Sequence, residues 1–275
     1  MALSDKFIYE NHLGLRFEEE CVYLNQSELR DYSWSYDAIN SRISRFYRPV
    51  TNRKIPLVVA GLNNDEAIAA KHRLLELAET DIEAILPGKI YIGEYYTKGF
   101  ITASTKSGYT RHKRFCGINL TLTSDDPSWY RERTHSFFPT TDSVVSDSGT
   151  DYPYDFPFDY VTTQIGGDIV CDSIRSNAFR IRIYGEIENP SITIGGHVYS
   201  IDGAIGSGET LLIDSLTKTI TLTKADGEKV NWFNNRNRES YIFQEIPSGE
   251  HTVIWNGTFG FDLTIIEKRS EPKWT

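Results

Sequence analysis

The side chains most suited to chemistry in this sequence, its histidines and cysteines, do not follow the spacing of a metal or catalytic site. No His-Glu-x-x-His pair occurs among His12, His72, His112, His135, His197 and His251. A structural zinc site needs converging histidine or cysteine ligands, which this spacing does not suggest. The cysteines are odd in number and far apart, at Cys21, Cys116 and Cys171, which favours reduced, buried thiols over a disulfide framework. We therefore expect no metal ion and no cofactor.

The motifs that accompany catalysis are also missing from the sequence. The glycine-rich stretch Gly203–Gly208 lacks the strand–loop–helix context and the Lys-Ser/Thr ending of a phosphate loop. No Gly-x-Ser-x-Gly elbow or local Cys-His signature occurs. Glycosidases use two carboxylates, and neither Glu239 nor Glu245 stands out from a solvated strand face. Prolines between the regularly spaced Asp151, Asp155 and Asp159 exclude a helix that would align them, and a calcium site in this segment has no further support. We predict that the chain is not an enzyme and keep a hydrolase as the third hypothesis.

Two other groups of residues suggest binding. Trp232 and Trp255 fall in β-rich sequence, where an indole can stack on a sugar, although a strand tryptophan more often belongs to the core. The main basic cluster consists of Arg42, Arg45, Arg48, Arg53 and Lys54. Because the net charge is −9, we assign this cluster to an inter-subunit or partner interface rather than to nucleic acid.

The elements that position these residues are almost all strands. Apolar residues alternate with polar ones over 118–122, 178–184 and 259–265, which predicts strands with one buried face. Gly195-Gly196 and Asn256-Gly257 predict two-residue hairpin turns. One amphipathic helix is expected at about Asn64 to Glu79, with an apolar side formed by Ala67, Ala70, Leu74, Leu77 and Ala78. The predicted fold class is mainly β.

The composition changes twice along the 275 residues. Residues 1–130 are β-rich and hold the helix, which indicates an α+β domain. Residues 131–160 include Tyr152–Tyr160, where aromatic residues alternate with prolines and aspartates, and are expected to form an extended linker. Residues 161–275 combine short strands with frequent turns, as in a β-sandwich or jelly roll. No apolar run reaches the ~20 residues of a membrane helix, and the N-terminus does not resemble a signal peptide, so we expect cytoplasmic synthesis and no membrane partner.

Several motifs together resemble one family. They are Tyr241-Ile-Phe243, Ile246-Pro-Ser-Gly249, Phe259-Gly-Phe-Asp-Leu-Thr264 and Arg269-Ser-Glu-Pro-Lys-Trp274, with looser matches at Pro87–Ile92, Asp126–Tyr130 and Tyr154–Tyr160. This set resembles the distal tail (Dit) proteins of long-tailed, non-contractile bacteriophages (siphophages), over nearly the whole chain and most specifically from Glu209 to Trp274.

The resemblance implies both a fold and a role. The N-terminal domain would form a six-fold ring, and the C-terminal domain would be a galectin-like sandwich. The protein would be a structural component of the virion's tail tip: a hexameric hub that joins the tail tube protein to the tail-associated tip protein and often to the receptor-binding protein. The alternative is a carbohydrate-binding β-sandwich protein that contacts host cell-wall sugars, although no insertion of carbohydrate-binding-module size occurs.

Overall fold

The computed structural model describes residues 6–25, 27–107, 114–139 and 165–274, which fall into two compact units. Unit 1 comprises Met1–Arg131 with Lys268–Thr275, and unit 2 comprises Glu132–Glu267. The unit boundaries fall inside strands β10 (Trp129–Phe137) and β21 (Gly260–Arg269). The predicted domains 1–130 and 161–275 differ from these units at the C-terminus, whose last residues pack with unit 1. The start of the predicted 131–160 linker belongs to β10, and its segment Tyr152–Tyr160 lies outside the described residues.

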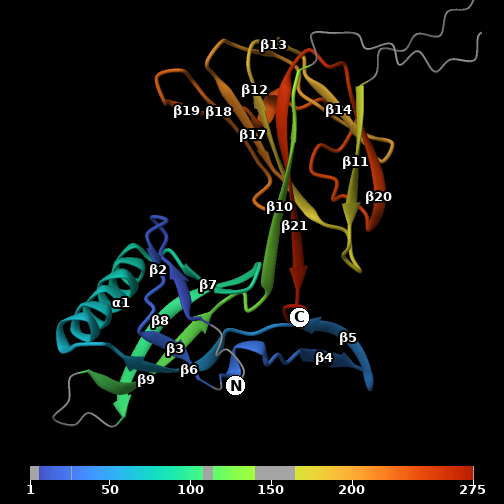
Figure 1. The fold of residues 1–275 in the computed structure, drawn as a ribbon. Helices are drawn as coiled ribbons and strands as arrows, with labels where there is room; N and C mark the ends of the chain where they lie inside the picture. Colours follow the sequence, from blue (N-terminus) through green and yellow to red (C-terminus); the bar gives the residue numbers. More distant parts are fainter. Residues whose placement is uncertain (1–5, 26, 108–113, 140–164, 275) are drawn as a thin grey trace, which may run out of the picture. The chain divides into compact units, whose positions relative to one another are not determined.

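Unit 1 consists of antiparallel strands and one α-helix among the described residues (Figure 1). Its further elements are β1 (Ile8–Glu10), β2 (Arg16–Phe17), β3 (Val22–Leu24), a 3-10 helix (Glu28–Arg30), β4 (Ser35–Ile39), β5 (Arg42–Tyr47), β6 (Thr51–Ala60), α1 (Asn64–Ala84), β7 (Gly88–Ile92), β8 (Tyr95–Ser107) and β9 (Phe115–Ser124). One run of strands has the order β10-β8-β7-β1-β2 and another the order β3-β6-β9-β8. Strand β8 joins the two runs, because its first half pairs with β7 and β10 and its second half with β9.

Helix α1 has a polar cap at its start and a left-handed residue at its end. The side chain of Asn63 accepts a hydrogen bond of 2.8 Å from the backbone N–H of Glu66. Ile85, directly after the helix, has a φ of 55°. The five apolar residues predicted for the buried side are buried. The helix runs five residues past its predicted end at Glu79, because the next position of the buried stripe is Asp81, which an apolar pattern cannot include.

Hydrogen bonds of Asp81 connect the last turns of α1 to Tyr9 and His12, near the N-terminus. Its carboxylate is completely buried and accepts a hydrogen bond from the Tyr9 hydroxyl. The backbone N–H of His12 donates to Asp81 Oδ1 at 2.8 Å, and His12 Nδ1 lies 2.6 Å from the same oxygen. Burial, followed by the hydrogen bond and the charge of Asp81, raises the pKa of Tyr9. A buried carboxylate of this kind is tolerated because protein donors surround it.

The C-terminal residues complete the opposite part of unit 1. Asp126 accepts hydrogen bonds from the Tyr130 hydroxyl, from Ser128 Oγ at 2.7 Å and from Lys268 Nζ at 3.1 Å. Burial alone would raise the pKa of Asp126, but these donors and the charge of Lys268 outweigh it and lower the pKa below its ordinary value. The strand that returns from unit 2 is thus attached to the loop before β10.

Unit 2 is a sandwich with one core. Its further elements are β11 (Ile165–Cys171), β12 (Ala178–Tyr184), β13 (Ile187–Glu188), β14 (Ser191–Ile194), β15 (His197–Ser200), β16 (Ala204–Ile205), β17 (Thr210–Asp214), β18 (Thr219–Thr223), β19 (Lys229–Asn231), a 3-10 helix (Phe233–Asn235) and β20 (Gly249–Trp255). The two sheets have the orders β19-β18-β17-β12-β21 and β11-β20-β14-β15, and β13 pairs with β16. Phe179 of one sheet contacts Tyr199 of the other, with ring centroids 4.9 Å apart. The predicted fold class, mainly β with one helix, is confirmed, while the galectin-like topology stays a prediction.

The two predicted hairpin turns had different outcomes. Gly195 and Gly196 both have positive φ, and Ile194 pairs with His197 across them, as predicted. The hairpin predicted at Asn256-Gly257 is wrong. Strand β20 pairs with β11 and β14, while β21 pairs with β12, so this turn carries the chain from one sheet to the other. The buried cysteines are free, as expected.

We expect the Asp81→Ala substitution to destabilise unit 1 by about 3 kcal/mol, because it leaves buried donors on Tyr9 and His12 without their acceptor. Urea unfolding would show a lower midpoint. Glu83→Ala, at an exposed position of the same helix, is the control and should change the free energy of unfolding by less than about 0.5 kcal/mol. Equal midpoints for the two variants would contradict the pinning role of Asp81.

We expect Asp126→Asn to cost about 1 kcal/mol at pH 7, an amount limited by the partial exposure of the carboxylate. Since the folded pKa of Asp126 is lowered, its contribution is present above the unfolded pKa of about 4 and is lost as pH falls through the folded value. The difference in urea midpoint between the wild type and the variant should therefore shrink from pH 7 to pH 3. Asp125→Asn, at the exposed neighbouring position, serves as the control. A difference that is unchanged at pH 3 would refute this assignment.

Candidate functional site: an exposed hairpin on an arginine base

Strands β4 and β5 form a two-stranded sheet that pairs with no other described strand. They are joined by Asn40 and Ser41, whose φ values of 50° and 62° give the positive backbone angles of a tight hairpin turn. Residues 42–47 are all exposed, as are 36–39. An isolated two-stranded hairpin is at best marginally stable in water, so a hairpin of this kind is expected to be completed by another molecule.

The register divides the hairpin into an apolar face and a charged face. Tyr36 pairs with Phe46 and Ala38 with Ile43, so these four side chains share one face. The other face carries the pairs Asp37–Arg45 and Ile39–Arg42. We call the first set, Tyr36, Ala38, Ile43 and Phe46, the apolar hairpin face. Its three large side chains are exposed by 60%, 54% and 58% for Tyr36, Ile43 and Phe46. A contiguous apolar surface of this kind is typical of a protein interface.

The base of the hairpin is held by Arg48. Its guanidinium lies 4.3 Å from the centroid of the Trp34 ring, a cation–π contact. It also donates to Ser128 Oγ at 3.2 Å and to the Oγ of Ser270. Arg53 is 5% exposed and donates to the carbonyl oxygen of Pro127 at 3.0 Å. Arg48 therefore links both ends of the hairpin to the C-terminal segment. Arg53 holds the loop before β10 through Pro127.

The same C-terminal segment is held by a third arginine. Arg30 donates to the carbonyl oxygen of Pro272 at 3.3 Å, and its guanidinium lies 4.2 Å from the centroid of the Trp274 ring. Burial, followed by the positive charge of Arg48, lowers the pKa of Arg53, which nevertheless keeps its hydrogen bond to the main chain. The base of the hairpin is thus a rigid part of unit 1.

The structure divides the basic cluster predicted from the sequence. Arg42 and Arg45 lie on the exposed hairpin, whereas Arg48 and Arg53 make the internal contacts described above. Lys54 lies on β6 with an exposed side chain, and its backbone N–H donates to Glu28 Oε2 at 3.0 Å. The interface role of the cluster stays a prediction, now concentrated on Arg42 and Arg45. The hairpin itself was not predicted, and its local sequence signal is Asn40 between two short β-rich runs.

The two tryptophans considered for sugar stacking belong to the packing of unit 2. Trp255 is 5% exposed, and its Nε1 donates to the carbonyl oxygen of Phe259 at 3.1 Å. Its ring makes T-shaped contacts with Phe137 and Phe261, at centroid distances of 5.3 and 5.4 Å. Trp232 is half-buried against the same core. We therefore build no binding site on this pair.

The described residues contain no group of three or more His, Cys, Asp or Glu side chains that could hold a metal ion. His112 and the three aspartates at 151, 155 and 159 lie outside the described part of the chain. In the described residues, no helix has the length and apolar character needed to cross a membrane.

Comparison with known proteins identifies the fold. No protein-family model and no curated protein sequence matches the chain. The Dit protein of phage SPP1, described as a paradigm of the hub adsorption apparatus in phages that infect Gram-positive bacteria, is similar with a TM-score of 0.55 and 11% identity, over 95% of this chain and 98% of that one. A chain of the phage P2 baseplate in its activated conformation with Ca is similar with a TM-score of 0.59 and 14% identity, over 98% and 100% of the two chains. The same baseplate with Sr matches equally well, over 97% and 99%. The resemblance inferred from sequence motifs is confirmed at the level of the fold: this chain has the fold of phage Dit hub and baseplate proteins.

Proposed function

We propose that this chain is a structural subunit of a phage tail tip, which assembles into a hexameric hub in the virion of a siphophage. The observation that carries the proposal is the exposed apolar hairpin face, which the contacts of Arg48 attach to unit 1. An identical copy in a ring completes a surface that no described part of the chain covers. The similarity to phage hub and baseplate proteins over nearly the full length of each chain supports the same role.

In this proposal the hub is non-enzymatic and acts by joining other proteins. Unit 1 forms the ring and contacts the tail tube protein on one side and the tail-associated tip protein on the other. Unit 2, a sandwich with its own core, presents a separate surface to the adsorption apparatus, including a receptor-binding protein. Synthesis takes place in the host cytoplasm before assembly.

We expect the purified protein to increase in mass towards a hexamer with rising concentration, as measured by light scattering. The substitution Phe46→Asp should weaken this association at least tenfold, because loss of one buried aromatic contact costs about 2 kcal/mol at an interface. Its thermal unfolding should match that of the wild type, since Phe46 lies outside the core.

The matched control is Ile174→Asp, which removes an isoleucine of unit 2 that is 90% exposed and should leave the association unchanged. A wild-type protein that stays monomeric at every concentration would count against the hub. Equal effects of the two substitutions would show that the hairpin is not the contact.

A further inference from the structure

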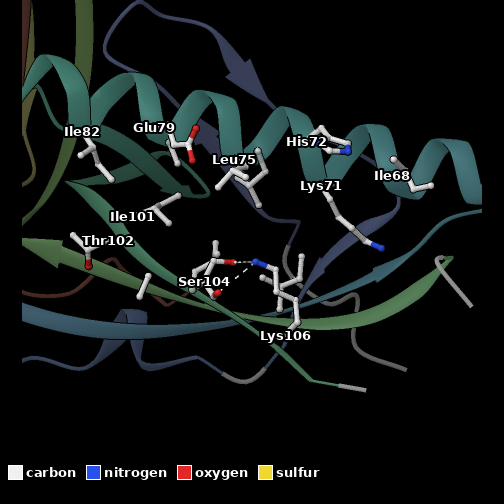
Figure 2. Close-up of a pocket in the computed structure, with 15 residues that line it drawn as sticks. Ile68, Lys71, His72, Leu75, Glu79, Ile82, Ile101, Thr102, Ser104 and Lys106 are labelled. Atoms are coloured by element: carbon white, nitrogen blue, oxygen red, sulfur yellow. Dashed lines mark hydrogen bonds between the residues drawn. The ribbon is translucent and has the colours of Figure 1, made fainter. Parts of the chain in front are cut away.

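Unit 1 has an apolar groove between α1 and the strands β8 and β9. Its volume is about 500 Å³. The helix contributes Ile68, Leu75 and Ile82, and the strands contribute mainly Ile101 and Leu120 to the floor. Figure 2 shows the labelled helix residues on the side of α1 that faces β8. Leu75 and Ile82 are 45% and 44% exposed, so α1 leaves this side open to solvent.

The three helix residues form a second apolar line, distinct from the buried one. Ile68, Leu75 and Ile82 are seven residues apart and therefore lie above one another along α1. The core-facing stripe runs through other positions, including Leu74 and Leu77. A helix that only covered its own sheet would need no second line of apolar residues. Exposed apolar surface next to a groove marks a binding site.

Strand β8, which lines the groove, has an edge without a partner strand among the described residues. Residues 100–107 of β8 pair with β9, and among the described strands no other pairs with this part of β8. The pairings with β7 and β10 involve only residues 95–99. An unpaired edge beside an apolar groove suits an occupant that is itself a strand or hairpin, because main-chain hydrogen bonds can then extend the sheet.

Charges on the groove and on the hairpin are complementary. Exposed Glu76, Glu79 and Glu83 follow the C-terminal half of α1, and Glu79 lines the groove. None of the three makes an ion pair within the described residues, and the same is true of Arg42 and Arg45 on the hairpin. Lys71 and Lys106 also line the groove. Exposed arginines on the hairpin and exposed carboxylates beside the groove favour association of the two sites and set its direction.

We propose that the apolar hairpin face of one copy occupies the α1–β8 groove of the next copy in the ring. Arg42 and Arg45 then lie beside Glu79 and its neighbouring carboxylates on α1. The contact is between copies because α1 and the β4–β5 hairpin lie at opposite ends of unit 1 (Figure 1), and the Arg48 contacts hold the hairpin there. Because the hairpin of one copy binds the groove of the next, the contact is head-to-tail, which is the type that closes into a ring. This inference rests on the proposed hub.

Cross-linking between engineered cysteines tests the contact directly. A variant with Ile43→Cys and Leu75→Cys carries one thiol on the hairpin and one in the groove, whereas Cys21, Cys116 and Cys171 are buried. After mild oxidation of the assembled protein, a denaturing, non-reducing gel should show a ladder of disulfide-linked oligomers up to six chains. The control pairs Ile43→Cys with Leu13→Cys, a 63%-exposed position outside the groove, and should stay monomeric on the same gel.

Charge reversal gives a second, independent readout. Arg45→Glu and Glu79→Arg should each weaken association at least tenfold in light scattering, and the two substitutions in one chain should restore most of it. If the wild type assembles but neither the ladder nor the rescue is seen, the groove is not the hairpin's site, although the hub proposal stands. If the wild type is monomeric at every concentration, the hub proposal and this inference both fail.

Discussion

The contacts of the Arg48 guanidinium are those on which the candidate site depends. A two-stranded hairpin with exposed faces has no core of its own, so its orientation is set only where it joins unit 1. There the guanidinium stacks on Trp34, before the hairpin, and donates to Ser128 and Ser270. Arginine suits this position because its planar fork combines stacking with several directed hydrogen bonds. An apolar surface held rigidly loses less conformational entropy when a partner covers it.

Unit 1 relies on two carboxylates that join segments distant in sequence, the buried Asp81 and the partly exposed Asp126. Asp81 ties the last turns of α1 to Tyr9 and His12, and Asp126 ties the loop before β10 to Lys268. Each carboxylate is surrounded by donors, which compensates for part of its desolvation. These contacts attach α1 and the C-terminal segment to unit 1, the compact unit that carries both the groove and the hairpin. In a head-to-tail assembly, the angle between the hairpin and the groove determines whether a ring closes.

Both units use aromatic residues in their cores. Phe7, Tyr9 and Trp129 are buried in unit 1, and Phe179, Tyr199, Trp255 and Phe261 meet across the two sheets of unit 2. Unit 1 also exposes Tyr36 and Phe46, which pair across its hairpin with ring centroids 6.5 Å apart. Neither ring belongs to a core cluster of the described residues, so both are available for association.

Local periodicity in the sequence was sufficient for the fold class, the helix and the buried strands. Alternation over 178–184 and 259–265 reports a buried face directly, because side chains of a strand point to opposite sides. Local turn chemistry was less informative. Asn256-Gly257 has the composition of a hairpin, but β20 is already paired on both edges, and only the tertiary structure shows that the chain changes sheets there.

The candidate site depended still more on tertiary structure. Arg42, Arg45, Arg48 and Arg53 are chemically equivalent in the sequence, and only the fold places two of them on an exposed hairpin and two in its base. The end of α1 was underestimated because Asp81 occupies a core position, where a charge is stable only with donors from residues distant along the chain. The sequence by itself thus determined the helix, most of the buried strands and which face of each of these strands is apolar. The tertiary structure decided which polar groups are buried and which apolar face is left uncovered, because both depend on contacts between residues far apart in the sequence.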